Sequence, residues 1–219
     1  AWFKAKSVAM TAMPQQVALY NGMGGGSAAA IGAVELLRFS AQGSAPSRIV
    51  LSAAVIGALI GAISLTGSII AWAKLDGVLD KRFTFPGQQY INLLVFLAAA
   101  LAGAYLFLGL DVRVIIAFFV LALLFGVMMT LPIGGADMPV VISLMNSYSG
   151  LAGAATGFVI DNNVLIISGS LVGASGVILT QIMCKAMNRS LANVLFGGMG
   201  GGVSSGPGAD SIYSQVRST

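Results

Sequence analysis

Two long stretches without a charged residue, 138–160 and 162–184, constrain what this chain can fold into. Charged residues bracket both of them, at Asp137, Asp161 and Lys185. At a rise of about 1.5 Å per residue, a helix of about 23 residues is about 34 Å long, which is enough to cross the hydrocarbon core of a bilayer. We therefore expect both stretches to be transmembrane helices.

The rest of the chain has the composition of an integral membrane protein. It is 57% hydrophobic and 8% charged, whereas soluble domains carry about 25% charged residues. The gaps between charges give six spans: 7–34, 49–73, 83–110, 114–136, 138–160 and 162–184. They predict an all-α bundle of six transmembrane helices, at about 13–37, 48–74, 88–109, 112–132, 137–160 and 162–187.

The basic residues indicate how these helices are oriented. With six spans, both termini lie on one side of the membrane. That side receives Lys4, Lys6, Lys74, Lys81, Arg82, Lys185, Arg189 and Arg217, and the other receives Arg38, Arg48 and Arg113. The positive-inside rule therefore places both termini in the cytoplasm. Because juxtamembrane residues account for the net charge of +4, we expect no nucleic-acid partner.

The ends of the chain differ from the spans. Residues 1–12 are expected to be the cytoplasmic end of a preceding segment, and residues 190–219, rich in Gly and Ser, a hinge toward a further domain. Cys184 is the single cysteine, which excludes an intramolecular disulfide, and the chain has no histidine, which argues against a metal site.

Small and polar residues recur at helical spacing within three spans. They are Gly57, Gly61, Ser64 and Ser68 in the second, Asn146, Ser149, Gly150, Gly153 and Gly157 in the fifth, and Gly169, Gly173 and Gly176 in the sixth. Small residues at this spacing let two helices approach closely. A polar group near mid-membrane must face protein or water. Asn146 therefore predicts either a hydrogen bond between helices or a hydrated path.

Four segments carry a resemblance to a known family: MPQQVALYNG (13–22), LTGS (65–68), ADMPVVISLMNSYSG (136–150) and LVGASGVILTQIMCKAMNRS (171–190). Together they resemble the β, or membrane, subunit of the proton-translocating nicotinamide nucleotide transhydrogenase. The similarity runs from about Met10 to Gly198 and corresponds to the last six helices of the membrane domain of that subunit.

This resemblance implies an activity. In that family, hydride passes between NAD(H) and NADP(H) on separate soluble domains, and the transfer is coupled to proton passage through the membrane domain. The chain would then be the proton-translocating part of the enzyme. It would lack the catalytic nucleotide-binding domains and bind no cofactor itself.

The resemblance also implies partners and a location. The partners are a transhydrogenase α subunit, with an NAD(H)-binding domain and membrane helices of its own, and an NADP(H)-binding domain following the C-terminus. A homodimer of the complete protomer is expected, embedded in the bilayer of the bacterial inner membrane.

Residue roles follow where the motifs match. The resemblance assigns Ser68 and Asn146 to the proton path and places Ser175 on the small-residue face of the last helix. With Asn21 and the neighbouring Ser147 and Ser149, these are the expected path residues. Asp137, Lys185 and Arg189 are expected at the interface with the nucleotide domain. Helix packing is expected at Gly57, Gly61, Gly169, Gly173 and Gly176.

One position departs from the family pattern. Many members carry a histidine in the first span, regarded as the group that takes up and releases the proton, and this chain has Asn21 there. An asparagine does not titrate, whereas histidine has an ordinary pKa of about 6.5. Either a histidine on another helix of the complex faces Asn21, or a boundary carboxylate has a raised pKa. We favour the first hypothesis.

Two other functions share some of these features. A small-solute transporter or channel would also place polar residues at mid-membrane, but it would be expected to show an internal repeat, and none is evident between the two halves. A passive membrane anchor would tolerate loss of Asn146 and Ser68. The resemblance favours the proton path over both alternatives.

Overall fold

The computed structural model describes residues 12–43, 46–79, 84–85 and 87–196. Its long helices are α2 (Met13–Gln42), α3 (Arg48–Leu75), α4 (Gln88–Tyr105), α5 (Val112–Thr130), α6 (Met138–Val159) and α7 (Asn163–Ala186). A short 3-10 turn, η2 (Gly135–Asp137), precedes α6, and a short helix, α8 (Leu191–Phe196), follows α7. These residues contain no strand, so the all-α expectation is confirmed.

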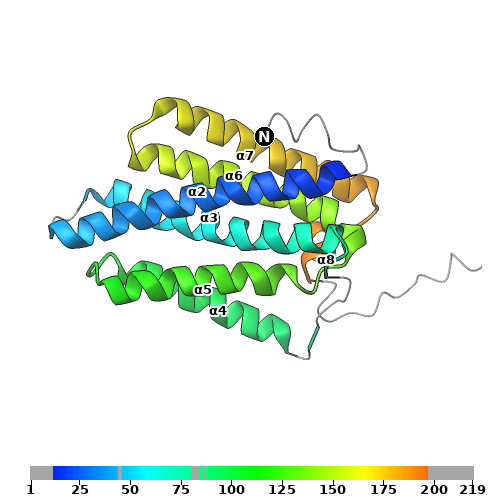
Figure 1. Cartoon of the computed structure of the whole chain (residues 1–219), viewed down its shortest axis with the longest axis horizontal. Helices are drawn as coiled ribbons and strands as arrows, with labels where there is room; N and C mark the ends of the chain where they lie inside the picture. The colour runs from blue at the N-terminus through cyan, green and yellow to red at the C-terminus, as the bar shows by residue number, and fades with distance from the viewer. Residues whose placement is uncertain (1–11, 44–45, 80–83, 86, 197–219) are drawn as a thin grey trace, which may run out of the picture.

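Successive long helices run in opposite directions along the long axis of the molecule (Figure 1). Helices α3 and α6 are central, because α3 packs against α2, α5 and α6, and α6 also packs against α7 and α2. Helix α4 packs mainly against α5 at the edge. The starts of α2, α4 and α6 therefore lie at the same end of the bundle as the ends of α3, α5 and α7.

Two helices differ from their predicted lengths. Helix α2 continues to Gln42, five residues past the predicted end (42 − 37), and Gly43 closes it with a φ of 61°. Glu35 and Arg38 form an ion pair at 3.6 Å within the helix. Charged residues mark where a helix leaves the lipid, not where it ends. Helix α4 stops at Tyr105 rather than at 109, in a turn that leads to Asp111.

The predicted terminal segments are only partly described. Residues 1–11 and 197–219 lie outside the described residues. The beginning of the predicted hinge folds as α8, in which the Val194 side chain is 1% exposed and joins the hydrophobic cluster around Met145 and Val141. The chain thus stays packed against the bundle for at least one turn past Arg189.

By length and hydropathy, four helices in the described part are apolar enough to cross a membrane: α3, α4, α5 and α7. Helices α2 and α6 are long enough but more polar, and they carry Asn21 and Asn146. Helix α6 is enclosed by α2, α3 and α7. A helix covered by protein does not need an apolar surface on every side, since the hydrocarbon does not contact it there.

Glycines bring the main chains of neighbouring helices together. A Cβ atom on Gly150 of α6 would lie 2.5 Å from the nitrogen of Gly173 and 2.9 Å from the carbonyl oxygen of Gly169, both on α7. Similarly, a Cβ on Gly61 of α3 would lie 2.6 Å from the carbonyl oxygen of Gly25 on α2. No side chain fits at either contact, so the helix spacing depends on glycine there.

The remaining predicted packing glycines also lie at helix contacts. A Cβ on Gly57 would meet the Ala155 side chain of α6 at 2.9 Å, and one on Gly176 would meet the nitrogen of Ser147 at 2.7 Å. On Gly173 it would meet the Leu151 side chain at 3.1 Å, and on Gly169 it would meet the main chain of Ala154.

We expect a substitution of Gly150 to Ala to destabilise the protein, because the added methyl group meets main-chain atoms that cannot move aside without separating α6 from α7. The expected loss is about 1–3 kcal/mol, as for overpacked cores. Thermal unfolding of the complete protein in detergent measures it. Gly153→Ala is the matched control on the same helix, since its Cβ would meet only a Leu165 methyl group at 3.9 Å. Equal melting temperatures for both variants would contradict the close contact.

Candidate functional site

Buried polar side chains of α2 and α3 meet inside the bundle. The Asn21 side-chain amide donates to the Ser68 hydroxyl at 3.0 Å, and both residues are buried. The glycine that follows Asn21 lets α3 come close, because a Cβ on Gly22 would lie 3.1 Å from the Ser68 Cβ. The Asn21–Ser68 pair thus connects the two helices directly.

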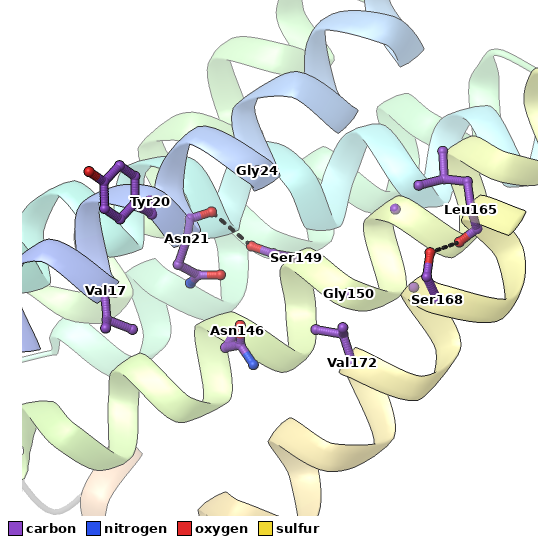
Figure 2. Close-up of a pocket in the computed structure, with 12 residues that line it drawn as sticks. Val17, Tyr20, Asn21, Gly24, Asn146, Ser149, Gly150, Leu165, Ser168 and Val172 are labelled. Atoms are coloured by element: carbon purple, nitrogen blue, oxygen red, sulfur yellow. Dashed lines mark hydrogen bonds between the residues drawn. The ribbon is translucent and has the colours of Figure 1, made fainter. Parts of the chain in front are cut away.

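A second pair connects α3 with α6. The Ser64 and Ser149 hydroxyl oxygens lie 2.6 Å apart, and Ser64 also lies 3.1 Å from the Met145 carbonyl oxygen. The Ser149 hydroxyl in turn lies 3.1 Å from the main-chain carbonyl oxygen of Asn21 (Figure 2). Ser64 and Ser68 share one face of α3 because they are four residues apart.

These residues lie at a common depth. Asn21 and Asn146 are each eight residues from the start of their helix (21 − 13 and 146 − 138), and Ser68 is seven residues from the end of α3 (75 − 68). At about 1.5 Å per residue, all three lie about 10–12 Å from the same end of the bundle. Residues from three segments far apart in the sequence thus form one polar layer.

The layer borders a groove of about 500 Å³ between α2, α6 and α7. Asn146, Asn21 and Ser149 line it, with Tyr20 on α2 and Ser168 on α7 (Figure 2). Gly24, Gly150, Gly153 and Gly169 also line it, and so do the apolar side chains of Val17, Leu165 and Val172. A groove of this size has room for several waters, since a water occupies about 30 Å³ in the liquid.

Asn146 is half-buried, and its side chain makes no hydrogen bond to any residue that the structure describes. It lines the groove (Figure 2). An amide offers both donors and acceptors, so it can bind waters or a polar group of another helix in the groove. The Asn146 amide is therefore available to bind a water or a polar group in the groove, and it does not join two of the described helices.

Two other predicted path residues lie elsewhere. The Ser147 hydroxyl is fully buried and donates to the Gly173 carbonyl oxygen at 2.8 Å, between α6 and α7. Ser175 is exposed on the outer side of α7, where its hydroxyl donates to Val172 of its own helix at 2.9 Å. The structure therefore brings Asn21, Ser68, Ser149 and Asn146 together but not these two residues.

Charged residues gather at one end of the bundle. Arg189 Nη1 donates to both carboxylate oxygens of Asp137, at 2.9 and 2.8 Å. The Asp137 side chain is 9% exposed and that of Arg189 is 44% exposed, so the ion pair closes the bundle between η2 and the segment after α7. Lys185, also predicted here, is exposed in the last turn of α7.

The position of Arg189 follows from how α7 ends. Asn188 has a φ of 51°, a conformation that asparagine tolerates better than most residues. The Arg189 N–H donates to the Cys184 carbonyl oxygen at 3.0 Å, and the Asn188 N–H to that of Lys185 at 3.1 Å. This is a Schellman motif, which turns the chain back toward Asp137.

Two further residues were not singled out from the sequence for these roles. Lys74, considered only as a cytoplasmic charge, is 8% exposed, and its ammonium group donates to the carbonyl oxygens of Leu131 and Ile133 just before η2. Ser64, assigned mainly to a packing stripe, is fully buried within the polar layer. The signal for Ser64 was its spacing of four residues from Ser68.

Comparisons with known proteins agree with the sequence resemblance. The family model for the NAD(P) transhydrogenase beta subunit matches residues 1–219. Two curated relatives from Rhodospirillum rubrum, one of them from a named strain, are each called NAD(P) transhydrogenase subunit beta. Each is 42% identical to this chain over 212 residues, which cover 94% of the chain and 46% of the relative. The chain therefore spans about half the length of the curated relatives that it matches.

The family match covers the apolar helices and the residues of the polar layer. It extends through the segments with Asn21, Ser68, Asn146 and Asp137. The resemblance inferred from the sequence is confirmed. The chain is a membrane protein and belongs to the NAD(P) transhydrogenase beta subunit family.

Proposed function

We propose that this chain is the membrane part of a proton-translocating NAD(P) transhydrogenase. All of α2 to α7 would span the bilayer of a bacterial inner membrane, with both termini in the cytoplasm. The alternating helix directions support this topology, because they gather Lys74, Lys185 and Arg189 at one end and put Arg38, Arg48 and Arg113 at the other. That asymmetry follows the positive-inside rule.

One observation carries the proposal: Asn146, Asn21 and Ser149 place polar side chains in a groove among α2, α6 and α7, at a depth where lipid would offer no hydrogen bonds. An isolated charge at the bilayer centre costs at least about 2.5 kcal/mol. Waters held by Asn146, Asn21 and Ser149 would lower that cost for a passing proton. A chain that only anchored a soluble enzyme would have no need for such a groove.

The residues that line the groove include no acidic or basic side chain. None of them is Asp, Glu, Lys or Arg, and the chain has no histidine. We therefore retain the hypothesis that a histidine of a partner helix faces Asn21. The groove supports it, because Asn21 and Asn146, whose side chains end in amide groups, both line it.

The charged end of the bundle is the proposed contact with the soluble domains. The ion pair of Asp137 with Arg189 lies directly before the segment that would lead into an NADP(H)-binding domain. Lys74 bonds to carbonyl groups just before η2 and so fixes the start of this segment. Arg189 bonds to Asp137, which directly precedes α6, so a movement of Arg189 would be transmitted through Asp137 to α6. Helix α6 carries Asn146 at the groove.

The remaining components would come from outside this chain. NAD(H) and NADP(H) would bind to soluble domains, one of them on the α subunit. Proton passage here and hydride transfer there would be coupled in a complete protomer that dimerises. This assignment follows the family rather than any nucleotide site in the described residues.

A change of Asn146 to Ala tests the groove. We expect proton pumping and coupled hydride transfer in the complete enzyme to fall together, by about tenfold or more, because waters in the groove lose a donor and an acceptor. Proton uptake into vesicles and hydride transfer are measured in parallel. Asn163→Ala is the matched control, because Asn163 is exposed at the start of α7. Wild-type rates in both variants would make Asn146 a packing residue.

The partner histidine can be located by substituting each histidine of the α subunit's membrane helices with Ala. We expect one substitution to abolish pumping, since no group in this groove replaces it. Adding Asn21→His to that variant should restore part of the activity, because the new imidazole would reach the same groove. If every histidine can be removed without loss of coupling, the hypothesis fails.

The ion pair is tested by exchanging its charges. We expect Asp137→Arg and Arg189→Asp to impair coupling singly, because each leaves two like charges together at the end of the bundle. The double variant should recover a large part of the activity. Hydride transfer and proton movement in reconstituted vesicles provide the readout. Equal loss in all three variants would show that the pair does not act as a contact between η2 and the post-α7 segment.

A further inference from the structure

The Ser64 and Ser149 hydroxyl groups have more contacts than they have hydrogens. Four oxygen atoms form a row of three contacts. Met145 O lies 3.1 Å from Ser64 Oγ, Ser64 Oγ lies 2.6 Å from Ser149 Oγ, and Ser149 Oγ lies 3.1 Å from Asn21 O. Each hydroxyl supplies one hydrogen, and the two main-chain carbonyl groups supply none. Three contacts at hydrogen-bond distance therefore share two hydrogens.

The shortest contact decides how they are shared. Two oxygens held 2.6 Å apart need a hydrogen between them, because this is a normal distance for an O–H···O bond and a repulsive one without the hydrogen. That leaves one hydrogen for the two outer contacts. When Ser64 donates to Ser149, Ser149 donates to Asn21 O. When Ser149 donates to Ser64, Ser64 donates to Met145 O.

The two arrangements differ at the groove. In the first, the Ser149 hydroxyl links α6 to the main chain of α2. In the second, its hydrogen points to Ser64 in the interior, and Ser149 presents only acceptor lone pairs to the groove that it lines. The Asn21 carbonyl oxygen is then released on the α2 side. Only hydroxyl rotations separate the two states, and no covalent bond breaks.

We infer that Ser64 is a positioning residue for the proton path, setting whether Ser149 is tied to α2 or offers an acceptor to the waters of the groove. The inference rests on the proposed function. Ser64 itself is fully buried and does not line the groove, so it acts through Ser149. The neighbouring Ser68 differs, because its hydroxyl oxygen accepts from Asn21 and contacts no second hydroxyl.

The contact also explains why α3 carries a serine at this point rather than an alanine. Packing alone asks only for a small side chain, since Gly25 and Gly61 already let α2 and α3 approach. The contact between Ser147 and Gly173 uses one hydroxyl and one carbonyl oxygen, whereas Thr180 of α7 and Ser143 of α6 pair two hydroxyls at 3.1 Å. At Ser64 a second hydroxyl is added, and with it the alternative arrangement.

A double-mutant cycle on the complete enzyme in vesicles tests the inference, with Ser64→Ala, Ser149→Ala and the double variant. Without Ser64, the Ser149 hydrogen stays on Asn21 O, and we expect proton translocation to slow about fivefold. Because Ser64 acts through Ser149, the double variant should be no slower than Ser149→Ala alone. Ser52→Ala is the matched control, since Ser52 lies on α3 and bonds only Ile49 of its own helix.

Each outcome decides a separate point. A Ser64→Ala enzyme that matches Ser52→Ala overturns the inference. The inference is also overturned if the fold reductions of the two single variants multiply in the double variant, because the two residues then act independently. It is overturned as well if the slower proton translocation is accompanied by a lower melting temperature, because this indicates a packing role. Failure of the proposed function is distinguishable, because the unmodified enzyme would then transfer hydride without moving protons, whatever residue stands at position 64.

Discussion

A side chain that can hydrogen-bond finds no water in the hydrocarbon layer of a membrane, so its partners must come from the protein itself. In the proposed topology the constraint acts on α2 and α6, the two long helices that are less apolar than the other four. They meet α3 through Asn21, Ser64, Ser68 and Ser149 rather than through apolar side chains alone. The other helices pack around this centre: α7 packs against α6, α5 packs against α3, and α4 packs against α5.

Glycine makes that arrangement possible. Where Gly150 faces Gly173 and Gly61 faces Gly25, main chains touch directly, and short serine side chains reach the carbonyl groups of the next helix. Such bonds contribute only about 0.6 kcal/mol each in membranes. They hold the helices in register without fixing them strongly, which suits a protein whose proposed work requires two states. The ion pair at the end of α7 adds a strongly directional contact.

Much of the fold could be predicted from the sequence, because charges bracket the helices so regularly. The end of α2 could not, since Glu35 and Arg38 read as a membrane boundary although the helix continues through them. The number and order of the helices follow from short stretches of sequence. The partner of each polar side chain depends on residues far along the chain. Asn146 and Ser147 are adjacent, yet one lines the groove and the other faces α7.

The site could likewise be predicted only in part. Residues at helical spacing could be assigned to one face, but the direction of that face depends on neighbours far along the chain. Ser175 shares the spacing of the α7 glycines closely enough to be grouped with them, and the structure turns it outward. Lys74 needed the α5 terminus beside it before its buried position could be recognised.

The short contact between Ser64 and Ser149 has a consequence for timing. Side-chain rotations of exposed residues take picoseconds to nanoseconds, and even collective helix motions take microseconds to milliseconds, whereas enzymes typically turn over about 1 to 1,000 times per second. Turning a hydroxyl group moves only its hydrogen atom, so we expect it to be fast on the scale of turnover. Both hydrogen-bond arrangements would therefore reach equilibrium many times during each catalytic cycle. The pair cannot store a state from one step to the next. At each moment, Ser64 therefore positions the Ser149 hydroxyl according to the arrangement that the surrounding helices and the groove favour.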